Sequence, residues 1–461
     1  MTDHFDVVVL GGGPGGYAAA LYAGAAGRSV ALVEESRVGG TCLHRGCVPA
    51  KELLQTAEVL RTVRGAGEFG VTVGEPALDL PTSQVRKQGV VDRLTKGVEG
   101  LLKQRGVTTV AGRGTVVDGP GRTVRVGERD LTGDALIVAT GSSPRSLPGL
   151  DFDGTRILSS DHVLTLDAVP ARVLVVGGGA IGCEFASMLV DYGSKVTLVE
   201  ALPRLLAGAD EQLGEFVERR FKRRGITVHT GATLQGITGT EELEVVVGTA
   251  DGATVSLVVD QVVVSVGRAP RTSGIGLEEA GVALEPSGHV RVDGHLRTSV
   301  PGVFAVGDIV PTPQLAHVGF AEAIVAVKTI LGEPVEPIDY AKVPWGIYCH
   351  PEVAWVGLTE AAAREQGIEI VTSVHRFGGN SRALILGEPD GLMKIVADPA
   401  GTLLGVHIVG PWATELIAEG YLAVNWEATA ADVGSLVHAH PTLSELFGES
   451  ALALTGRGLH G

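Results

Sequence analysis

Hydrophobic and polar positions repeat one arrangement twice along the chain: an apolar strand, a glycine-rich turn, a helix and a second apolar strand. In the first copy, apolar residues 7–10 lead into a turn with Gly11, Gly13 and Gly16, and a second apolar run follows at 30–34. This order is typical of a βαβ unit that binds a dinucleotide. The first copy therefore predicts a dinucleotide-binding domain near the start of the chain.

The second copy has the same parts. Apolar residues 173–176 lead into a turn with Gly177, Gly179 and Gly182, and the closing strand covers residues 196–200. One such turn is a weak indication of a nucleotide site, but two turns, each between an apolar strand and a helix, are a strong one. We expect two Rossmann-like dinucleotide-binding domains.

Each copy closes with an acid, Glu34 in the first and Glu200 in the second, at the same spacing from the first glycine of its turn. A carboxylate there can bind adenosine ribose hydroxyls, while the helix N-terminus receives the pyrophosphate. The alternative is an acid that merely ends a strand, which the matched spacing disfavours. A carboxylate would repel a 2′-phosphate, and the nearest arginine is Arg204, so Glu200 favours NAD over NADP.

The rest of the chain predicts further strands and a different C-terminal part. Apolar strands end at Gly141, at Gly267 and before Asp308. All four tryptophans lie beyond residue 344, which suits an α+β interface domain. The predicted class is α/β: two Rossmann-like dinucleotide-binding domains followed by an α+β C-terminal domain.

Composition narrows the class of protein. The chain has 461 residues, 66 of them glycine, and 44% are hydrophobic, which predicts several globular domains with many tight turns. The net charge is −16 and no block of Lys or Arg interrupts it, so nucleic acid and anionic membranes are poor partners. Four cysteines do not make a secreted disulfide scaffold. A first strand close to the initiator Met and the lack of a long apolar run predict a cytoplasmic protein without a signal peptide.

The candidate chemistry lies in residues 39–51, just after the first glycine turn, where Cys42 and Cys47 are five positions apart. Two thiols this close can alternate between dithiol and disulfide, and a flavin at the preceding turn can exchange electrons with them. A structural bridge and a pair of inert buried thiols are the alternatives. A zinc site with His44 as third ligand lacks a second cysteine pair. The pattern favours an enzyme that moves electrons between a nicotinamide, a flavin and a disulfide.

These residues resemble a known family. The run 39–51, both glycine turns and the tail 438–445 are similar to the dihydrolipoamide dehydrogenases, which are FAD-dependent pyridine nucleotide–disulfide oxidoreductases. The similarity covers essentially the whole chain and includes residues 265–270 and 350–357. It implies a homodimer in which each active site spans two chains. It also implies an FAD domain at 1–143, an NAD domain at 144–270, a central domain completing the FAD site at 271–341 and a dimerisation domain at 342–461.

The resemblance also assigns the catalytic residues. Cys47 is expected to lie beside the flavin, and Cys42 to form the mixed disulfide with substrate. His440 is expected to take the proton from a dihydrolipoyl thiol, and Glu445 to orient its ring. Without the flanking match, His438 would compete with His440 for this role.

Further cofactor contacts follow from the same resemblance. Lys51 is expected to meet Glu184 near flavin N5, although a Glu184 in the first turn of its helix is also explained by the helix dipole. Asp308 is expected to bind the ribityl hydroxyls, and Ala316 with His317 to begin a helix at the pyrimidine end of the flavin. The expected FAD contacts are Gly11, Gly13, Gly16, Glu34, Lys51, Gly141, Asp308, Ala316 and His317. The expected NAD contacts are Gly177, Gly179, Gly182, Glu184, Glu200 and Gly267.

Some residues depart from the family pattern. His44 and Arg45 replace less basic residues between the cysteines, and we expect them to lower a thiolate pKa. Residues 318–322 are less charged than is common in the family. We expect Cys183 and Cys349 to be ordinary core residues.

The predicted function is oxidation of protein-bound dihydrolipoamide to lipoamide, with NAD⁺ reduced to NADH. The predicted partner is a lipoyl domain of a 2-oxoacid dehydrogenase complex or a glycine-cleavage carrier. Another FAD-dependent reductase, for glutathione or a low-molecular-weight thiol, is disfavoured by Glu200 and by residues 443–445. A mercuric reductase is disfavoured because the C-terminal tail lacks a cysteine pair. A low-turnover flavin redox sensor or scaffold would need no His–Glu proton relay.

Overall fold

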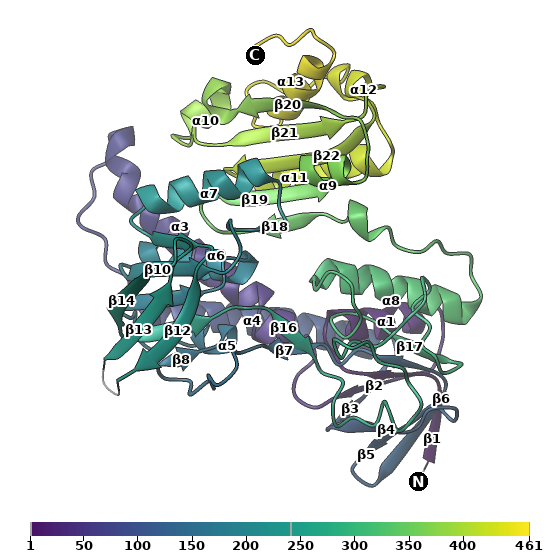
Figure 1. The fold of residues 1–461 in the computed structure, drawn as a ribbon. Helices are drawn as coiled ribbons and strands as arrows, with labels where there is room; N and C mark the ends of the chain where they lie inside the picture. The colour runs from purple at the N-terminus through teal and green to yellow at the C-terminus, as the bar shows by residue number, and fades with distance from the viewer. Residues whose placement is uncertain (1, 240–241, 461) are drawn as a thin grey trace. The chain divides into compact units, whose positions relative to one another are not determined.

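The structure of the protein is a computed structural model that describes residues 2–239 and 242–460. The chain forms two units, each built from separate stretches of sequence. The first unit contains Met1–Leu53, Pro81–Arg145 and Arg268–Tyr340, and the second contains Leu54–Leu80, Ser146–Gly267 and Ala341–Gly461. Both units combine helices with β-sheets, some with parallel and some with antiparallel strands (Figure 1). The α/β prediction is therefore confirmed.

A seven-stranded sheet is the centre of the first unit. Along it β3, β2, β1, β6, β5 and β4 are neighbours in that order, and β17 pairs with β6. The glycine-turn strand β1 lies in the middle, where Val9 is the neighbour of Leu32 and Ile137, and all three side chains are fully buried. The strands are β1 (Thr2–Leu10), β2 (Val30–Glu34), β3 (Thr108–Ala111), β4 (Gly114–Asp118), β5 (Thr123–Val126), β6 (Arg129–Val138) and β17 (Val303–Ala305).

The helices of the first unit place its glycine turn against other backbone. A Cβ atom built on Gly319 of α8 would lie 3.4 Å from the backbone N of Gly15 in α1, so these two helices approach closely through glycine. A two-stranded ladder of β7 (Ser142–Pro144) and β16 (Arg268–Pro270) adds a short second sheet. The helices are α1 (Pro14–Ala25), α2 (Gly40–His44), α3 (Cys47–Gly65), which begins in this unit, α4 (Leu80–Gln104) and α8 (Ala316–Leu331).

The nucleotide part of the second unit has a parallel sheet and an antiparallel one. The parallel sheet has the strand order β11, β10, β9, β15, β8, and β12, β13 and β14 form a meander. The strands are β8 (Ile157–Leu158), β9 (Arg172–Val176), β10 (Lys195–Glu200), β11 (Thr227–Thr230), β12 (Thr233–Thr238), β13 (Leu243–Gly248), β14 (Thr254–Val259) and β15 (Gln261–Val264). The helices are α5 (Ser160–Val163), α6 (Ala180–Asp191) and α7 (Glu211–Arg223).

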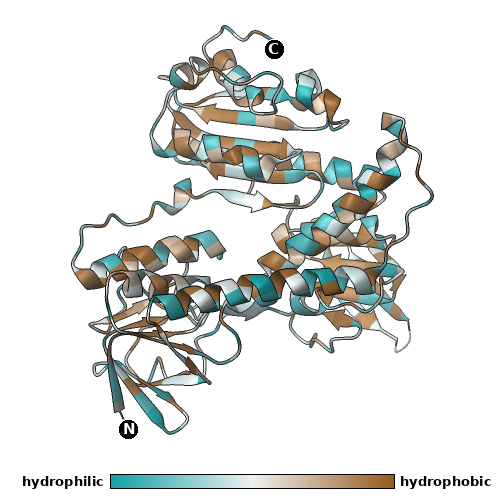
Figure 2. Cartoon of the chain, turned by 180° about the vertical axis from the view of Figure 1, so that it is seen from behind, coloured by the Kyte–Doolittle hydropathy of each residue, from teal (hydrophilic) through white to brown (hydrophobic). Residues whose placement is uncertain are grey.

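The C-terminal part of the second unit is an antiparallel sheet with helices, as expected for an α+β domain. Its strand order is β18, β19, β22, β21, β20, and Figure 2 shows the inner strands of this sheet largely in the brown of hydrophobic residues. Trp345 and Trp355 stack across neighbouring strands with ring centroids 5.3 Å apart. The strands are β18 (Trp345–Ile347), β19 (Glu352–Gly357), β20 (Val371–Arg376), β21 (Leu392–Ala397) and β22 (Leu403–Gly410). The helices are α9 (Glu360–Glu365), α10 (Ser381–Ile385), α11 (Ala413–Asn425), α12 (Ala430–Gly434) and α13 (Glu445–Leu454).

Short 3₁₀ turns complete the described secondary structure at Ala66–Phe69, Tyr340–Lys342 and Phe377–Gly379. None of the helices in residues 2–239 and 242–460 is long and apolar enough to span a bilayer. The expected central domain is part of the first unit here, because residues 268–340 belong to that unit and β17 extends its sheet. The bounds of the four expected domains remain a prediction.

Candidate functional site

The first glycine turn leaves no room for side chains. Gly11 has a φ of +104°, and its N–H donates to the carbonyl of Val33 at 2.8 Å. A Cβ atom on Gly16 would lie 1.8 Å from the carbonyl oxygen of Gly11. Gly13 is the N-cap of α1 and makes no side-chain cap bond. The strand therefore passes into the helix over bare backbone, and this cradle, which a Cβ would fill, fits the pyrophosphate of a dinucleotide.

Glu34 is fixed at the rim of this turn. Its carboxylate accepts the N–H of Gly12 at 2.7 Å and the N–H of Ser36 at 2.8 Å, one on each oxygen. A carboxylate oxygen has two acceptor positions, so both oxygens can still accept ribose hydroxyls. Glu34 thus does more than end a strand, because it anchors the turn beside which a ribose would lie.

The second glycine turn repeats this geometry in the second unit. Gly177 has a φ of +108° and donates to the carbonyl of Val199 at 2.8 Å. A Cβ atom on Gly182 would lie 1.8 Å from the carbonyl oxygen of Gly177. Glu200 accepts the N–H of Gly178 at 2.5 Å and the N–H of Leu202 at 2.7 Å, and Gly179 caps α6. Both predicted turns therefore fit a dinucleotide in the same way.

The segment that carries the thiols is docked on the first glycine turn. The N–H of Gly39 donates to the carbonyl of Gly12 at 2.7 Å. A Cβ atom on Gly40 would lie 2.6 Å from Cα of Gly13, and Gly39 and Gly40 have φ values of +106° and +53°. The close approach at Gly40 leaves no room for a Cβ atom, and the φ of Gly39 lies where side chains are strongly disfavoured. The two glycines before Cys42 therefore bring the thiols to the dinucleotide turn.

Cys42 lies in α2 and Cys47 is the first residue of α3. Both are free thiols, Cys42 half-buried and Cys47 exposed. Its hydrogen bond with Cys47, together with burial, raises the pKa of Cys42, and the positive charge of Lys51 opposes the rise. The imidazole of His44 is occupied, since its Nε2 donates to the carbonyl of Val38 at 2.9 Å. The effect of His44 and Arg45 on the thiols remains a prediction.

Asp308 follows β17 and is held by two residues to which sequence reasoning assigned no role. The hydroxyl of Ser142 donates to its carboxylate at 2.5 Å. Nε of Arg268 donates in turn to the hydroxyl of Ser142 at 2.7 Å. Arg268 lies within the motif 265–270, which was the available signal. These two hydrogen bonds fix one carboxylate oxygen of Asp308 just after β17, a strand of the seven-stranded sheet that also carries the first glycine turn.

Glu322 is a second carboxylate that sequence reasoning did not recognise as part of the site. It is fully buried in α8 and accepts the N–H of Gly307 at 2.6 Å, the hydroxyl of Thr312 at 2.7 Å and the hydroxyl of Tyr340 at 3.0 Å. Burial raises the pKa of Glu322 to about 7. The signal for it was an acid in an otherwise apolar helix. Glu322 secures the turn that presents Asp308.

Helix α8 begins at Ala316, as predicted, and His317 is its second residue. Its N-cap Leu315 has no side chain that can accept the first N–H groups, which leaves a positive helix end for negative charge. Gly141 and Gly267 have φ values of +72° and +107°, so both strand-end glycines adopt left-handed turns.

His440 and Glu445 are brought together. Nδ1 of His440 lies 2.9 Å from Oε1 of Glu445, and Oε2 accepts the N–H of Thr442 at 2.8 Å. Burial opposes ionisation of Glu445, but the Thr442 N–H and His440 prevail and hold its pKa below the usual range. With Nδ1 donating to the carboxylate, Nε2 of a neutral His440 has the free lone pair.

His438 has a different environment. Its Nε2 lies 2.8 Å from Oε1 of Glu419 in α11. The side chain is 12% exposed, against 70% for His440. A base must be reachable by its substrate, so this geometry favours His440 over His438 for that role.

The position of Glu184 within its helix differs from the expected one. It is the fifth residue of α6, beyond the first turn, which holds no acid. The helix-dipole explanation is therefore wrong for this residue. Its buried carboxylate accepts the N–H of Tyr348 at 3.0 Å. Lys51 and Glu184 belong to different units, so their pairing remains a prediction.

Cys183 and Cys349 are buried, as expected for core residues. Burial raises the pKa of both thiols, which makes them poor nucleophiles.

Known proteins match the chain along its length. Residues 5–323 match the pyridine nucleotide-disulphide oxidoreductase family, and residues 343–451 match its dimerisation domain. The dihydrolipoyl dehydrogenases of Bacillus subtilis and Cupriavidus necator are 41% and 39% identical to the chain, with complete coverage of both sequences. Crystallised LpdA from Mycobacterium tuberculosis is 29% identical, with a TM-score of 0.90 over 98% of this chain and 99% of its own. The HOCl-induced flavoprotein disulfide reductase RclA from Escherichia coli is 25% identical, with a TM-score of 0.85 over 97% and 99% of the two chains.

Two dinucleotide cradles, with a dithiol resting on one of them, define a nucleotide-dependent thiol–disulfide oxidoreductase. The matches with known proteins identify the family within this class of oxidoreductase. The chain belongs to the pyridine nucleotide-disulphide oxidoreductase family, which uses FAD and NAD, and its curated full-length relatives are dihydrolipoyl dehydrogenases.

Proposed function

We propose that the protein oxidises protein-bound dihydrolipoamide to lipoamide and reduces NAD⁺ to NADH. The observation that carries the proposal is the Cys42–Cys47 dithiol, docked through Gly39 and Gly40 on the first glycine turn. The names of the full-length relatives support the same reaction. A glutathione-type or other low-molecular-weight disulfide reductase is the second candidate, because the dithiol alone does not select the substrate.

The first unit supplies the residues for FAD and the second those for NAD. Gly11, Gly13 and Gly16 would hold the FAD pyrophosphate, with Glu34 at its ribose. Bound FAD supplies a two-electron acceptor for the thiols and a hydride donor for NAD⁺. Other first-unit contacts would be Lys51, Gly141, Asp308, Ala316 and His317. The NAD contacts would be Gly177, Gly179, Gly182, Glu184, Glu200 and Gly267.

The proton chemistry would belong to His440. Its Nε2 takes a proton from a dihydrolipoyl thiol, while Glu445 holds Nδ1–H and stabilises the imidazolium. The lipoyl thiolate bonds to Sγ of Cys42 as the Cys42–Cys47 bond breaks, and Cys47 leaves as a thiolate. The second lipoyl thiol then attacks the mixed disulfide, closes the lipoyl ring and leaves its proton on Cys42. The charge of Lys51, which acts to lower the pKa of Cys42, would favour the departure of Cys42 from the mixed disulfide in this second step.

The dimerisation domain supports a homodimer. We propose that His440 of one chain serves the thiols of the other, that the partner is a lipoyl domain of a 2-oxoacid dehydrogenase complex or a glycine-cleavage carrier, and that the enzyme works in the cytoplasm. Glu200 favours NAD over NADP, since its carboxylate would repel a 2′-phosphate.

The test is NADH formation from dihydrolipoamide and NAD⁺ by FAD-loaded protein, with glutathione disulfide and NADPH as the comparison pair. Anaerobic two-electron reduction is expected to give a long-wavelength thiolate–flavin absorption band, which Cys47→Ser removes while FAD stays bound. Cys183→Ser is the matched control and keeps the band. If dihydrolipoamide and NAD⁺ give no NADH, the proposal is wrong. Faster turnover of glutathione disulfide supports the second candidate.

A further inference from the structure

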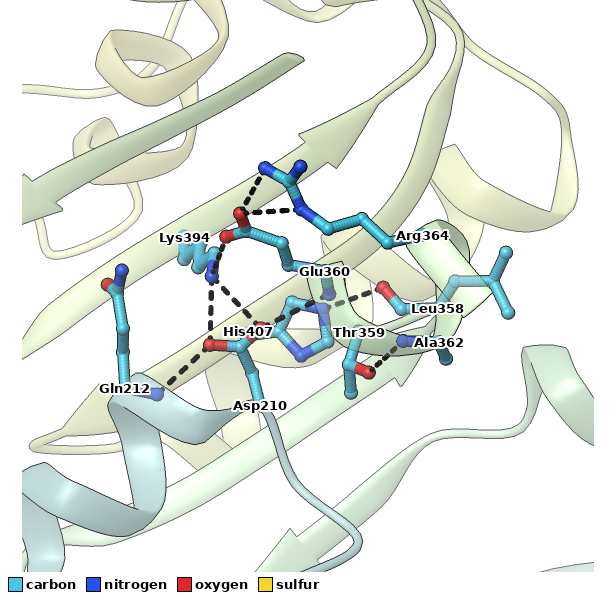
Figure 3. Close-up of polar contacts among 9 residues, drawn as sticks. All are labelled: Asp210, Gln212, Leu358, Thr359, Glu360, Ala362, Arg364, Lys394 and His407. Atoms are coloured by element: carbon cyan, nitrogen blue, oxygen red, sulfur yellow. Dashed lines mark hydrogen bonds and ion pairs between the residues drawn. The ribbon is translucent and has the colours of Figure 1, made fainter. Parts of the chain in front are cut away.

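A buried group of charges lies in the second unit, where β21 of the C-terminal sheet meets the start of α7. Nζ of Lys394 in β21 is 3.0 Å from both carboxylate oxygens of Asp210 and 2.7 Å from Oε2 of Glu360 (Figure 3). The side chains of Lys394 and Asp210 are each 2% exposed. We call Lys394, Asp210, Glu360 and His407 the Lys394 cluster.

The two carboxylates of the cluster have lowered pKa values. Burial acts to raise the pKa of Asp210, but His407, Lys394 and the N–H of Glu360 together outweigh it, and the pKa lies below its usual range. Hydrogen bonds from Lys394 and Arg364 lower the pKa of Glu360. Burying such charges costs free energy, and apolar side chains of equal volume often stabilise a protein as well or better. The retained charges therefore point to a specific arrangement that they enforce.

His407 of β22 closes one side of the cluster without adding charge. Its ring is fully buried, and Nε2 donates to the carbonyl of Leu358 at 3.0 Å. Burial lowers its pKa to about 4, so the ring is neutral at neutral pH. Nδ1 has no hydrogen-bond partner within residues 2–239 and 242–460. Lys394 is therefore the cation that holds Asp210.

Asp210 has a second set of contacts. Its carboxylate caps α7 by accepting the N–H of Gln212 at 3.2 Å, and it also accepts the N–H of Glu360 at 3.3 Å. Asp210 is the last residue of the connection that leaves β10 at Glu200. The position of Asp210 thus sets where the intervening loop, residues 201–209, ends.

That loop lies on the second glycine turn. The N–H of Leu206 donates to the carbonyl of Gly178 at 2.9 Å, and Leu205 and Leu206 are buried. A Cβ atom on Gly178 would lie 2.6 Å from Cδ2 of Leu205. The loop is therefore fixed at two points: at Gly178, which also donates to Glu200, and at Asp210, which Lys394 holds.

We propose that the Lys394 cluster is a positioning device for the nicotinamide nucleotide. Through Asp210, Lys394 holds loop 201–209 against the turn of Gly178 and Glu200 and so keeps the ribose-binding carboxylate in place. This inference rests on the proposed function of the second glycine turn as the NAD site. Lys394 acts on the glycine turn only through Asp210 and loop 201–209, so Lys394 and Asp210 are positioning residues.

Two variants separate this role from a purely structural one. Asp210→Asn keeps a cap for Gln212 and removes the charge that faces Lys394, and Lys394→Met removes the cation at similar length. Both are expected to weaken NAD⁺ binding about five- to tenfold, measured by calorimetric titration of FAD-loaded protein. The rate of flavin reduction by dihydrolipoamide is expected to stay unchanged, because that half-reaction uses the first glycine turn, the thiols and the His440–Glu445 pair and does not use the second glycine turn. Arg219→Gln, which removes an exposed cation of α7, is the matched control.

A lower urea midpoint with unchanged NAD⁺ affinity in Asp210→Asn overturns the proposal, since that is the result of a purely structural cluster. If Lys394→Met does not fold, Asp210→Asn decides alone. Failure of the proposed function is seen separately, because it leaves wild-type protein without NADH formation from dihydrolipoamide. Failure of the inference leaves wild type active and the variants with wild-type NAD⁺ affinity.

Discussion

The two histidines of the segment before α13 show, at the scale of single residues, how surroundings decide chemistry. His438 is turned onto Glu419 and largely buried, while His440 is exposed and paired with Glu445. Both have a carboxylate partner, so a His–Glu pair alone does not identify a base. Exposure of the side chain distinguishes them, because a substrate thiol reaches the exposed His440 more readily than the largely buried His438.

The role of Glu445 can be tested with Glu445→Gln. The amide keeps the shape but cannot stabilise an imidazolium as a carboxylate does, so kcat for dihydrolipoamide oxidation is expected to fall by about 10²-fold. Steady-state kinetics with NAD⁺ measure this. Glu449→Gln is the control, since Glu449 lies on the same helix as Glu445 and pairs with a different histidine, His460. Equal kcat values for both variants would contradict the assigned role.

At the scale of elements, the sequence predicts whatever repeats with a strong period. Residues 30–34 are observed as β2 with the expected bounds, and the second glycine turn lies between β9 and α6 as expected. The meander β12–β14 was not predicted, because short antiparallel strands carry no glycine signature. Helix α4 was missed because its apolar positions are sparse and most of its residues are exposed.

The residues of the site also divide into those that a sequence pattern predicts and those that it does not. The glycines and Glu34 could be found because a fixed backbone shape demands fixed residues at fixed spacing. The roles of Cys42, Cys47 and His440 came from the family resemblance. Ser142 and Arg268 were missed because their contacts join elements far apart in the sequence. Glu322 was missed because an acid in a helix does not by itself indicate which turn it holds. Lys394 was missed for the same reason as Ser142 and Arg268.

Helix α8 provides a pH-dependent prediction through Glu322. Its folded-state pKa of about 7 lies above the model-peptide value of 4.5, so the folded protein binds more protons than the unfolded chain between these values. Stability from this group is therefore complete below about pH 4.5 and is lost as pH rises towards 7, by about 3 kcal/mol at most.

Glu322→Gln is expected to remove this slope. The amide oxygen can accept from Gly307, and the hydroxyls of Thr312 and Tyr340 can reverse to accept from the amide N–H₂. Urea unfolding of both proteins between pH 4.5 and 7 measures the difference. An identical fall in the free energy of unfolding in wild type and variant would rule out Glu322 as its source.

At the scale of the whole molecule, the segment that carries His440 also carries exposed apolar side chains. Leu436 is exposed, and Val437 is 98% exposed. Apolar area in water is unfavourable by about 25 cal/mol per Å². Because residues 343–451 match the dimerisation domain, we expect a second copy of the chain to cover these side chains.

Val437→Asp tests this expectation. A charge buried at the interface is expected to weaken the dimer and to make turnover fall on dilution, since a site shared between chains is lost when they separate. Sedimentation velocity distinguishes the 47.5 kDa chain from a species of twice that mass. Val258→Asp, on exposed β14, is the control. A variant that stays dimeric on dilution would place the interface elsewhere.

The carboxylate of Glu200 has a consequence for redesign. It accepts the N–H groups of Gly178 and Leu202, so the protein fills an anion-binding nest of its own backbone with its own anion. Glu200→Ser would empty that nest and leave two converging donors suited to a phosphate. If Glu200 selects NAD as proposed, this single substitution is expected to shift the coenzyme preference towards NADP while the backbone of the glycine turn stays unchanged.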